Sequence, residues 1–404
     1  MEITKFYIDR LCCIGIDICS DTIRCAYAFK SEPQNCFMDK ESWFDPSCSL
    51  ILDENKKIVK YGKDADELMF DQTSTYNSGY YVFKRYPQMF FKTTEFAVDL
   101  MIRDENGKPM KAGELFETVI NYHKHRCEKT VEKGFLPKDL YYVVTIPSVS
   151  GDQGKTFMRS VLDKCGFLTG RACVHLAHEV TPYYKDQDGT CFDNGMLMDI
   201  SFEDCRTGCI SVLTKHEDHT VNEIVPVSAG PWGSMFIVDS ILSLIESICG
   251  INTVSCCNQY ELHHLLKYIS RTLQQRNDKS LVTFRLPLDM IEICRKSAKF
   301  KSDYKSHVTL VADKLRIQGD ILDNAMFPLI EEFLKYIDHL LDAPKVRPVT
   351  CIVVHGEPAS YPVVKQMLES KYAGNRKLTF CENLFVVKAA ILHGFNETRN
   401  SLCS

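Results

Sequence analysis

The sequence predicts an α/β protein with more than one lobe or domain. Strand-like and helix-like segments alternate along the chain, and the 404 residues are more than one small core needs. Two strand-like segments also share one plan, in which an aspartate and a short polar turn lead into a second strand. Hydrophobic residues make up 45% and charged residues 25%, which is typical of globular proteins and excludes wholesale disorder.

In the first half, apolar runs bounded by turn residues predict three strands. The expected strands are residues 11–17, 23–29 and 140–146. Residues 154–165 are expected to form a helix, because apolar side chains recur there at helical spacing. Gly166 is a plausible cap just beyond that helix.

The second half repeats this style. A strand is expected over 195–199, ending in an acid, and a returning strand over 209–214. Residues 234–249 form an amphipathic pattern of helical period. Proline favours the first turn of a helix, so Pro328 is expected to open the long helix that continues to residue 341. A strand is expected over 349–354, and Pro362 is expected to open the helix that follows it.

Residues 15–29 and 197–213 suggest an internal duplication, since both contain a strand, an aspartate, a polar turn and a second strand. Two ordinary hairpins are the alternative interpretation. The polar stretches 71–79 and 186–195 are expected loops, and the second of them is the preferred boundary between the halves.

Composition excludes several classes of function. The net charge is −5, which disfavours a dedicated nucleic-acid binder, and no apolar run is long enough to span a membrane. No signal peptide is recognisable. The 19 cysteines include no CxxC pair, so reduced buried thiols and a cytoplasmic location are expected in preference to disulfides or zinc. The basic run 295–305 is either a solvated face or an attractor for a phosphate or an acidic partner.

Two strand ends that each present an aspartate and a tight turn favour a site for phosphate and magnesium. Backbone N–H groups in such turns can surround phosphate oxygens, and the acids would hold the ion mostly through water. Glycines are the residues that allow the backbone to approach phosphates closely.

Eight segments, in collinear order over nearly the whole chain, resemble the ATPase domain of the 70-kilodalton heat-shock protein family, and most closely its divergent twelfth branch. They read GIDICSDTIRCAYAF at 15–29, YYVFKRY at 80–86, YYVVTIPSVSGDQGKTFMRSVLDKCGF at 141–167, VHLAHEVTPYY at 174–184, GMLMDISFEDCRTGCISVL at 195–213, SAGPWGSMFIVDSIL at 228–242, VTCIVVHGEPASYPVVKQML at 349–368 and NLFVVKAAILHGF at 383–395. The resemblance implies a two-lobed, actin-like (ribonuclease H-like) fold with a cleft between the lobes. It favours the duplication over two unrelated hairpins.

The resemblance also implies lobes and a site. Lobe I would span 1–184 and lobe II 185–382, with 383–404 closing back toward lobe I. ATP or ADP with magnesium would be the cofactor. The catalytic residues would be Asp17, Lys84, Glu179 and Asp199, with Asp17 and Asp199 organising the metal. The residues facing the nucleotide would be Cys19, Ser20, Asp21, Ser201, Phe202, Gly230, Gly233, Gly356 and Ser360.

The loops depart from the family pattern, Asp-x-Gly-Thr-Thr and Asp-x-Gly-Gly-Gly-Thr. Cys19 and Ser201 stand where the family has glycine, and Glu203 and Asp204 would face a polyanion. Non-glycine residues forced to positive φ cost about 1 kcal/mol or more each. Like charges at 4 Å repel by roughly 1–4 kcal/mol. We therefore expect weak nucleotide binding with impaired or absent hydrolysis.

The main alternative is a nucleotide-free pseudo-ATPase that serves as a protein-interaction scaffold. A sugar kinase or filament former of the same superfamily is less favoured. Each site residue also has a plain structural interpretation: Asp17 and Asp199 as turn formers, Lys84 as a solvated cation and Glu179 as a helix cap. The chain ends at residue 404, soon after the expected closing helix, so no peptide-binding domain is expected within it.

Overall fold

The structure is a computed structural model, and it confirms the predicted α/β class. It describes residues 10–19, 22–38, 47–70, 79–91, 93, 95–131, 135–167, 170–184, 195–202, 206–218, 220–250, 257, 259–276, 281–296, 304, 306–381 and 384–396. The chain separates into two compact units. Unit 1 comprises residues 1–199, 211–227 and 383–404, and unit 2 comprises residues 200–210 and 228–382. The lobe boundaries expected at residues 184 and 382 stay a prediction.

The first five-stranded sheet lies in unit 1 and has the order β10-β9-β1-β2-β3. Its strands are β1 (Cys12–Ile18), β2 (Ile23–Phe29), β3 (Glu32–Met38), β9 (Leu140–Ile146) and β10 (Ala172–Leu176). β1 pairs antiparallel with β2 and parallel with β9, and β9 pairs parallel with β10. The chain therefore returns to the centre of this sheet more than a hundred residues after leaving it.

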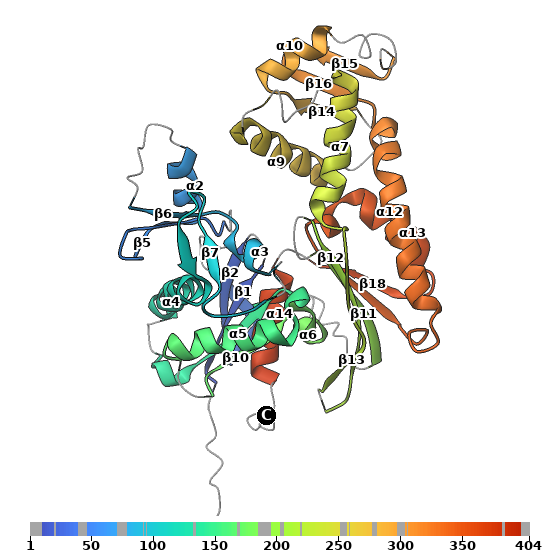
Figure 1. Ribbon diagram of the computed structural model, residues 1–404. Coiled ribbons are helices and arrows are strands. Elements are labelled where there is room, and N and C mark those ends of the chain that lie inside the picture. Colours follow the sequence, from blue (N-terminus) through green and yellow to red (C-terminus); the bar gives the residue numbers. More distant parts are fainter. Residues whose placement is uncertain are drawn as a thin grey trace, which may run out of the picture. The chain divides into compact units, whose positions relative to one another are not determined.

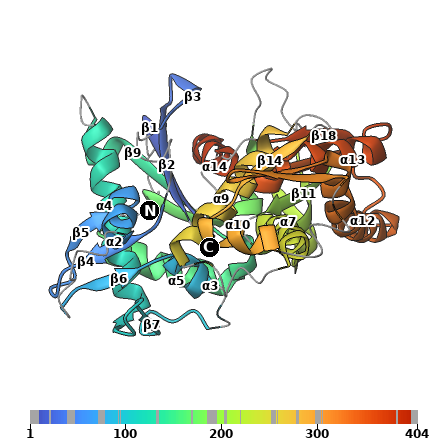
Figure 2. The same ribbon diagram turned by 90° about the horizontal axis from the view of Figure 1, so that it is seen from above.

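Every residue of β1 is buried because helices cover both faces of the sheet. Helix α14 (Phe385–Asn396) packs on one face, and α4 (Ala112–Val131) and α5 (Gly151–Lys164) lie on the other, as the second view shows for α4 and α14 (Figure 2). Gly15 allows α14 to approach, since a Cβ there would lie 2.9 Å from a methyl carbon of Val387. Ile14 and Ile16 join the apolar core on the α4 side.

Short elements complete unit 1. They are β4 (Leu50–Leu52), β5 (Ile58–Tyr61), α2 (Lys63–Phe70), β6 (Tyr81–Phe83), α3 (Tyr86–Phe91), β7 (Met101–Arg103), β8 (Pro109–Lys111), α6 (Ala177–Val180) and the 3-10 turns η1 (Pro137–Asp139), η2 (Ser148–Ser150) and η3 (Thr181–Tyr183). β4, β5 and β6 form a three-stranded sheet, and β7 pairs with β8. Figure 1 shows α2, β5 and β6 close together, with α4 below them.

The second five-stranded sheet has the order β13-β12-β11-β17-β18. Its strands are β11 (Gly195–Phe202), β12 (Gly208–Lys215), β13 (Val221–Gly230), β17 (Cys351–Gly356) and β18 (Lys377–Phe380). The order matches that of the first sheet, with three consecutive strands followed by two later ones. This repeated topology supports the duplication inferred from the sequence. The division between the two units falls within β11, β12 and β13.

Unit 2 adds helices and a small sheet of its own. They are α7 (Ser234–Cys249), α9 (Gln259–Gln275), β14 (Val282–Arg285), α10 (Leu288–Lys296), β15 (Val308–Val311), β16 (Lys314–Ile317), α12 (Gly319–Asp342), the 3-10 turn η4 (Glu357–Ser360) and α13 (Pro362–Tyr372). The expected helix over 234–249 agrees with α7 at both ends, and Pro362 opens α13 as expected. The small sheet has the order β14-β16-β15.

Several expected element ends differ from the structure, such as those of α5 and β17, and two further differences have a clear physical reason. Pro328 does not open the long helix but lies inside α12, which begins at Gly319. Buried apolar residues such as Met326 and Ile330 lie on both sides of the proline, so burial of one continuous face outweighs the lost hydrogen bond. Strand β11 does not end at its aspartate but continues to Phe202, since the residues that follow lack glycine.

Fifteen cysteines are described, and all of them are free thiols. Eleven of the fifteen are buried, Cys12 and Cys13 among them. Burial raises the pKa of the Cys12 thiol to about 12. Within the described part of the chain, no helix is long and apolar enough to cross a membrane.

Candidate functional site

Asp17, near the end of β1, is 2% exposed and lies between two neighbours fixed by strand register. Thr145 is its partner on β9 and Arg24 is its partner on β2. The Thr145 hydroxyl donates a hydrogen bond of 2.8 Å to Oδ1 of Asp17. A guanidinium nitrogen of Arg24 lies 3.7 Å from Oδ2. The first predicted acid is therefore buried next to a cation.

In the turn after β1, a backbone N–H group that could bind a phosphate oxygen is already hydrogen-bonded within the chain. The N–H of Cys19 donates to the carbonyl oxygen of Thr22 over 2.9 Å, which closes the turn. The Cys19 thiol donates to Oδ2 of Asp17 over 3.2 Å and lies 3.3 Å from a nitrogen of Arg24. Ser20 and Asp21, the other residues predicted for this loop, lie outside the described residues.

Asp199, on β11, is 1% exposed and accepts a hydrogen bond of 2.9 Å from the hydroxyl of Thr181 in η3. Asp17 and Asp199 are thus both buried carboxylates, and each accepts a hydrogen bond from a threonine hydroxyl. Each threonine belongs to a separate part of the chain, so only the tertiary fold brings these pairs together.

The residues after Asp199 continue the strand and enter the interior. Ser201 is 1% exposed and Phe202 is 7% exposed. The Phe202 ring packs against that of Phe333 on α12, with 5.6 Å between centroids. Gly356 has a φ of +94°, and a Cβ on it would lie 2.8 Å from the Cβ of Phe202. Phe202 is therefore a core residue that makes close contact with the β17 turn.

Gly230 and Gly233 flank Trp232 between β13 and α7. A Cβ on Gly230 would lie 2.7–2.8 Å from three atoms of the Trp232 ring. That ring packs against Phe333 and Tyr336 of α12, at centroid distances of 5.2 and 4.8 Å. Trp232 therefore packs against a helix of its own unit. Gly233 is the N-cap residue of α7 and has an extended conformation.

Glu179, in α6, is held by cations of its own unit. Oε1 accepts a hydrogen bond of 2.7 Å from Lys155, while Oε2 accepts the N–H of Leu176 over 2.9 Å and lies 3.4 Å from Nδ1 of His175. Burial by itself would raise the pKa of the Glu179 carboxyl, but the bonds from His175, Lys155 and Leu176 lower it well below its usual range. Glu179 is thus ionised and paired.

Histidines surround this acid. Burial would lower the pKa of His175, but Cys173 and Glu179 outweigh it and raise that pKa to about 10. His178 is 3% exposed, and its backbone N–H donates to the Ser148 hydroxyl over 3.2 Å. Burial lowers the pKa of His178, and the nearby Asp199, Glu179 and Glu223 oppose that shift.

Lys84, the fourth predicted catalytic residue, lies in the turn between β6 and α3 and is half-buried. The next residue, Arg85, has a φ of +46°, which is unusual for a residue with a side chain. A positive φ here turns the chain sharply between the strand and the helix.

The β17 turn carries a polar network that sequence reasoning missed. Glu357, next to Gly356, accepts hydrogen bonds from the hydroxyl of Ser270 and, over 3.3 Å, from the amide of Gln274, both on α9. The predicted Ser360 is exposed, and its hydroxyl donates to the carbonyl oxygen of Glu357 over 2.6 Å. Only the spacing of Ser270 and Gln274, one helical turn apart, could have suggested a shared partner.

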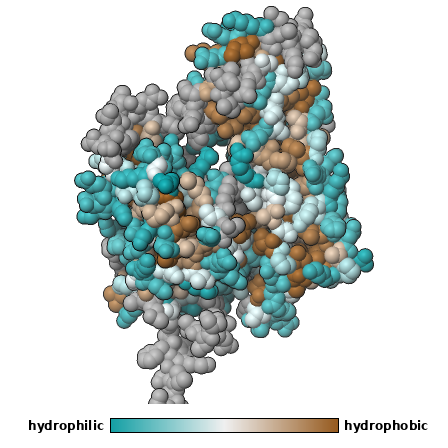
Figure 3. Space-filling model, viewed as in Figure 1, coloured by the Kyte–Doolittle hydropathy of each residue, from teal (hydrophilic) through white to brown (hydrophobic). Residues whose placement is uncertain are grey.

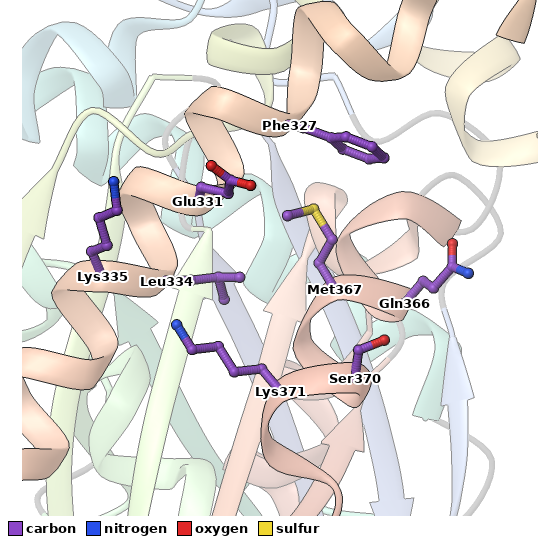
Figure 4. A pocket seen from close by; sticks show the side chains of 8 residues that line it. All are labelled: Phe327, Glu331, Leu334, Lys335, Gln366, Met367, Ser370 and Lys371. Carbon is purple, nitrogen blue, oxygen red and sulfur yellow. The ribbon is translucent and has the colours of Figure 1, made fainter. Parts of the chain in front are cut away.

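A separate hollow lies between α12 and α13 and has a volume of about 610 Å³. Side chains of both helices surround it (Figure 4). Its lining residues are Phe327, Glu331, Leu334, Lys335, Gln366, Met367, Ser370 and Lys371. None of the predicted site residues is among them.

Comparison with solved structures defines the class of fold. The chain matches the crystal structure of MreB5 of Spiroplasma citri bound to ADP with a TM-score of 0.56 at 11% sequence identity, and the match covers 95% of both chains. The chain therefore has the actin-like ATPase fold, as the sequence predicted.

Comparison with curated proteins narrows this class. Heat shock 70 kDa protein 12A of Mus musculus and of Homo sapiens are each 19% identical to this chain over 471 aligned positions, which cover 95% of the chain and 69% of the relative. No family model matches the sequence. The predicted resemblance to the twelfth heat-shock branch is confirmed as a weak but nearly full-length similarity.

Several residues of the candidate site were absent from the sequence prediction. They are Arg24, Thr145, Lys155, His175 and Thr181. Arg24 alone had a local signal, because it and Asp17 flank the same turn and hairpin pairing sets them opposite each other. The others reach the acids from other elements.

Proposed function

We propose that this actin-fold module binds ATP or ADP weakly and hydrolyses it slowly or not at all. The fold is shared with a protein whose crystal structure contains ADP. One observation of the molecule carries the proposal. Two sheets of the same strand order each bury an aspartate in the first of their strands along the chain, and each aspartate accepts a hydrogen bond from a threonine hydroxyl. Burying a carboxylate is unfavourable without such partners, so the matched pairs indicate a function for both acids.

The same surroundings explain why binding would be weak. The Cys19 N–H already has a carbonyl partner, and Phe202 directs its ring into the core where the family has glycine. Fewer backbone N–H groups are thus available to phosphate oxygens than in a glycine-rich turn. Glu179 is paired with Lys155 and His175, which opposes a role in organising a metal's water shell.

Magnesium fits this site only as an ion that the nucleotide brings. Within the described ranges, no group of three His, Cys, Asp or Glu side chains is placed to hold a metal ion directly. Mg²⁺ commonly keeps several waters and uses one or two carboxylates together with substrate phosphates. Asp17 and Asp199 are the two carboxylates that we assign to this role, and the ion would neutralise phosphate charge there.

Calorimetric titration with ADP and ATP, with and without Mg²⁺, tests the proposal. We expect a dissociation constant in the range of tens to hundreds of micromolar, or about −5 to −7 kcal/mol. Asp17→Asn and Lys84→Ala should weaken binding at least about fivefold, while Asp342→Asn, an exposed acid outside the site, should leave it unchanged. An absence of both heat and thermal stabilisation at millimolar nucleotide would contradict the proposal.

The second candidate is a nucleotide-free scaffold. The pairing of Asp17 with Arg24 and of Glu179 with Lys155 favours it, because cations of the chain itself already balance these acids. The test is to denature the purified protein and quantify released nucleotide by chromatography. Stoichiometric nucleotide would rule out this candidate.

The cellular setting is also a proposal. Similarity to Heat shock 70 kDa protein 12A supports a chaperone-like role in a stress response, and the many free buried thiols support a cytoplasmic location. Fractionation of cells that express the tagged chain, before and after heat stress, would test both.

A further inference from the structure

The small sheet of unit 2 has two faces of opposite character. Strand register pairs β14 with β16 and β15 with β16, both antiparallel. Because side chains alternate along a strand, one set of residues shares each face. On the first face, Val282, Phe284, Val308, Leu315 and Ile317 are all buried. This face is the core of the small sheet.

The second face carries three cations. Arg285 lies opposite Lys314, and Arg316 lies opposite Thr283 on one side and Thr309 on the other. Val311, which is 51% exposed, lies opposite Lys314. Among the described residues, none of the three cations forms an ion pair, and the face includes no acid. The closest acid along the chain is Asp313, in the turn between β15 and β16.

Three cations on one face of a small sheet destabilise that sheet. Like charges placed directly opposite each other on neighbouring strands repel, and Arg285 and Lys314 are placed in that way. The surrounding sequence does not compensate for them. Residues 281–317 contain eight Lys and Arg but four Asp and Glu, a net charge of +4 in a chain whose total is −5. The face is therefore a local positive surface on an acidic protein.

Exposed apolar side chains occur in the same part of unit 2. Leu288 at the start of α10 is 76% exposed and Leu281 just before β14 is 52% exposed. The space-filling view shows hydrophobic residues among hydrophilic ones where α10 lies (Figures 1 and 3). A partner that matches this surface would combine negative charge with apolar contacts.

We propose that this face, formed by Arg285, Lys314, Arg316, Thr283, Thr309 and Val311, binds an acidic segment of a partner protein that also carries apolar side chains. The guanidinium group of arginine binds a carboxylate through two parallel hydrogen bonds, and the threonine hydroxyls are further hydrogen-bond donors. The net charge of the whole chain disfavours long polyanions such as nucleic acids or anionic membranes, because these extend beyond the positive face. The charges of a short acidic segment would lie within one Debye length of these cations, so salt would screen their attraction only in part.

The experiment measures fluorescence anisotropy of a labelled peptide in which glutamate alternates with leucine and glycine, titrated with the full chain at low and physiological salt. The test variant is R285Q/K314Q/R316Q, and the control is K335Q/R347Q/K377Q, which removes three exposed cations elsewhere in unit 2. We expect the test variant to bind the peptide about tenfold more weakly and the control to bind as the unaltered chain does. A peptide with glutamine in place of glutamate should not bind.

Folding is checked on the same samples. Because the three cations repel one another, the test variant should melt at the same temperature as the unaltered chain or higher. Equal peptide affinity of the test variant and the unaltered chain would overturn the proposal. Tighter binding of an oligothymidine or of phosphatidylserine vesicles than of the peptide, at equal salt, would also overturn it and assign the face to that other class of partner.

Discussion

The two strand–turn–strand segments, residues 12–29 and 195–215, start from one plan and end differently. In the first, the chain turns directly after β1, and Asp17 is buried between Thr145 and Arg24. In the second, β11 continues three residues beyond Asp199, and Phe202 enters the core against Phe333. Neither segment has the glycines of the family pattern, and the residues that stand there give different structures.

The difference shows two ways in which residues other than glycine can follow a strand that carries a buried aspartate. The first segment keeps a turn but fills it with its own polar and charged groups, such as Cys19 and Arg24. The second continues as a strand to Phe202, whose ring packs in the core. In the first segment, Arg24 balances the charge of Asp17 and the Cys19 N–H is occupied, whereas in the second an aromatic side chain occupies the core.

The largest effect is expected at the contact that the second segment makes with β17. Gly356→Ala should destabilise the protein by about 2–4 kcal/mol, because a φ of +94° is strained for alanine and its Cβ would clash with Phe202. Urea unfolding measures this loss. Gly374→Ala is the control, since nothing lies within 4 Å of a Cβ there, and it should change stability by less than about 1 kcal/mol. Equal effects of both variants would refute the contact.

The next effect tests the pair of charges in the first segment. Asp17→Asn should cost about 1–3 kcal/mol, because it removes a buried charge that pairs with Arg24. In a double-mutant cycle with Arg24→Gln, we expect a coupling of about 1 kcal/mol. Asp199→Asn, the matched variant of the second segment, keeps an acceptor for the Thr181 hydroxyl and should cost less. A coupling of zero would mean that the two charges do not stabilise each other.

A smaller effect concerns pH and the cations around Glu179. The pKa of His175 is raised to about 10, so its pairing with Glu179 stabilises the folded state fully below about pH 6.5 and is lost as pH rises toward 10. The lowered pKa of Glu179 acts at the other end, where stability is lost as pH falls below about 4. Since the His175 side chain is 22% exposed, we expect its pairing with Glu179 to contribute about 1 kcal/mol to the free energy of unfolding.

Melting temperatures at about pH 7 and pH 9.5 measure the alkaline arm. The unaltered chain should lose more stability between these values than His175→Asn, in which this pair is absent while the cysteines titrate as before. The same loss in both proteins would show that other groups cause it.

The smallest expected effect asks whether the first segment can be restored. Arg24→Gln removes the cation beside Asp17 and should increase the affinity for Mg-ADP about threefold, or roughly 0.7 kcal/mol. Arg347→Gln, an exposed arginine in unit 2, is the control and should not change the affinity. Weaker binding in Arg24→Gln would instead show that Arg24 contacts the nucleotide.

The sequence by itself determined the elements and the positions of the acids. Periodicity located β2, β9 and α7 at the ends that the structure gives them, because alternation and helical spacing are local properties. It also located Asp17 one residue before the end of β1, whereas β11 continues three residues beyond Asp199. The missing glycines were readable in the same way, since each loop is a single short segment.

Only the tertiary structure decided what those residues contact. Thr145 reaches Asp17 through the parallel pairing of β1 and β9, and α9 reaches Glu357 from a distant part of the chain. The sequence likewise did not predict the cations around Glu179 or the burial of Phe202. The physical reason is that strand register and helix packing depend on the whole core, so a local pattern fixes which face a side chain occupies but not which partner it meets.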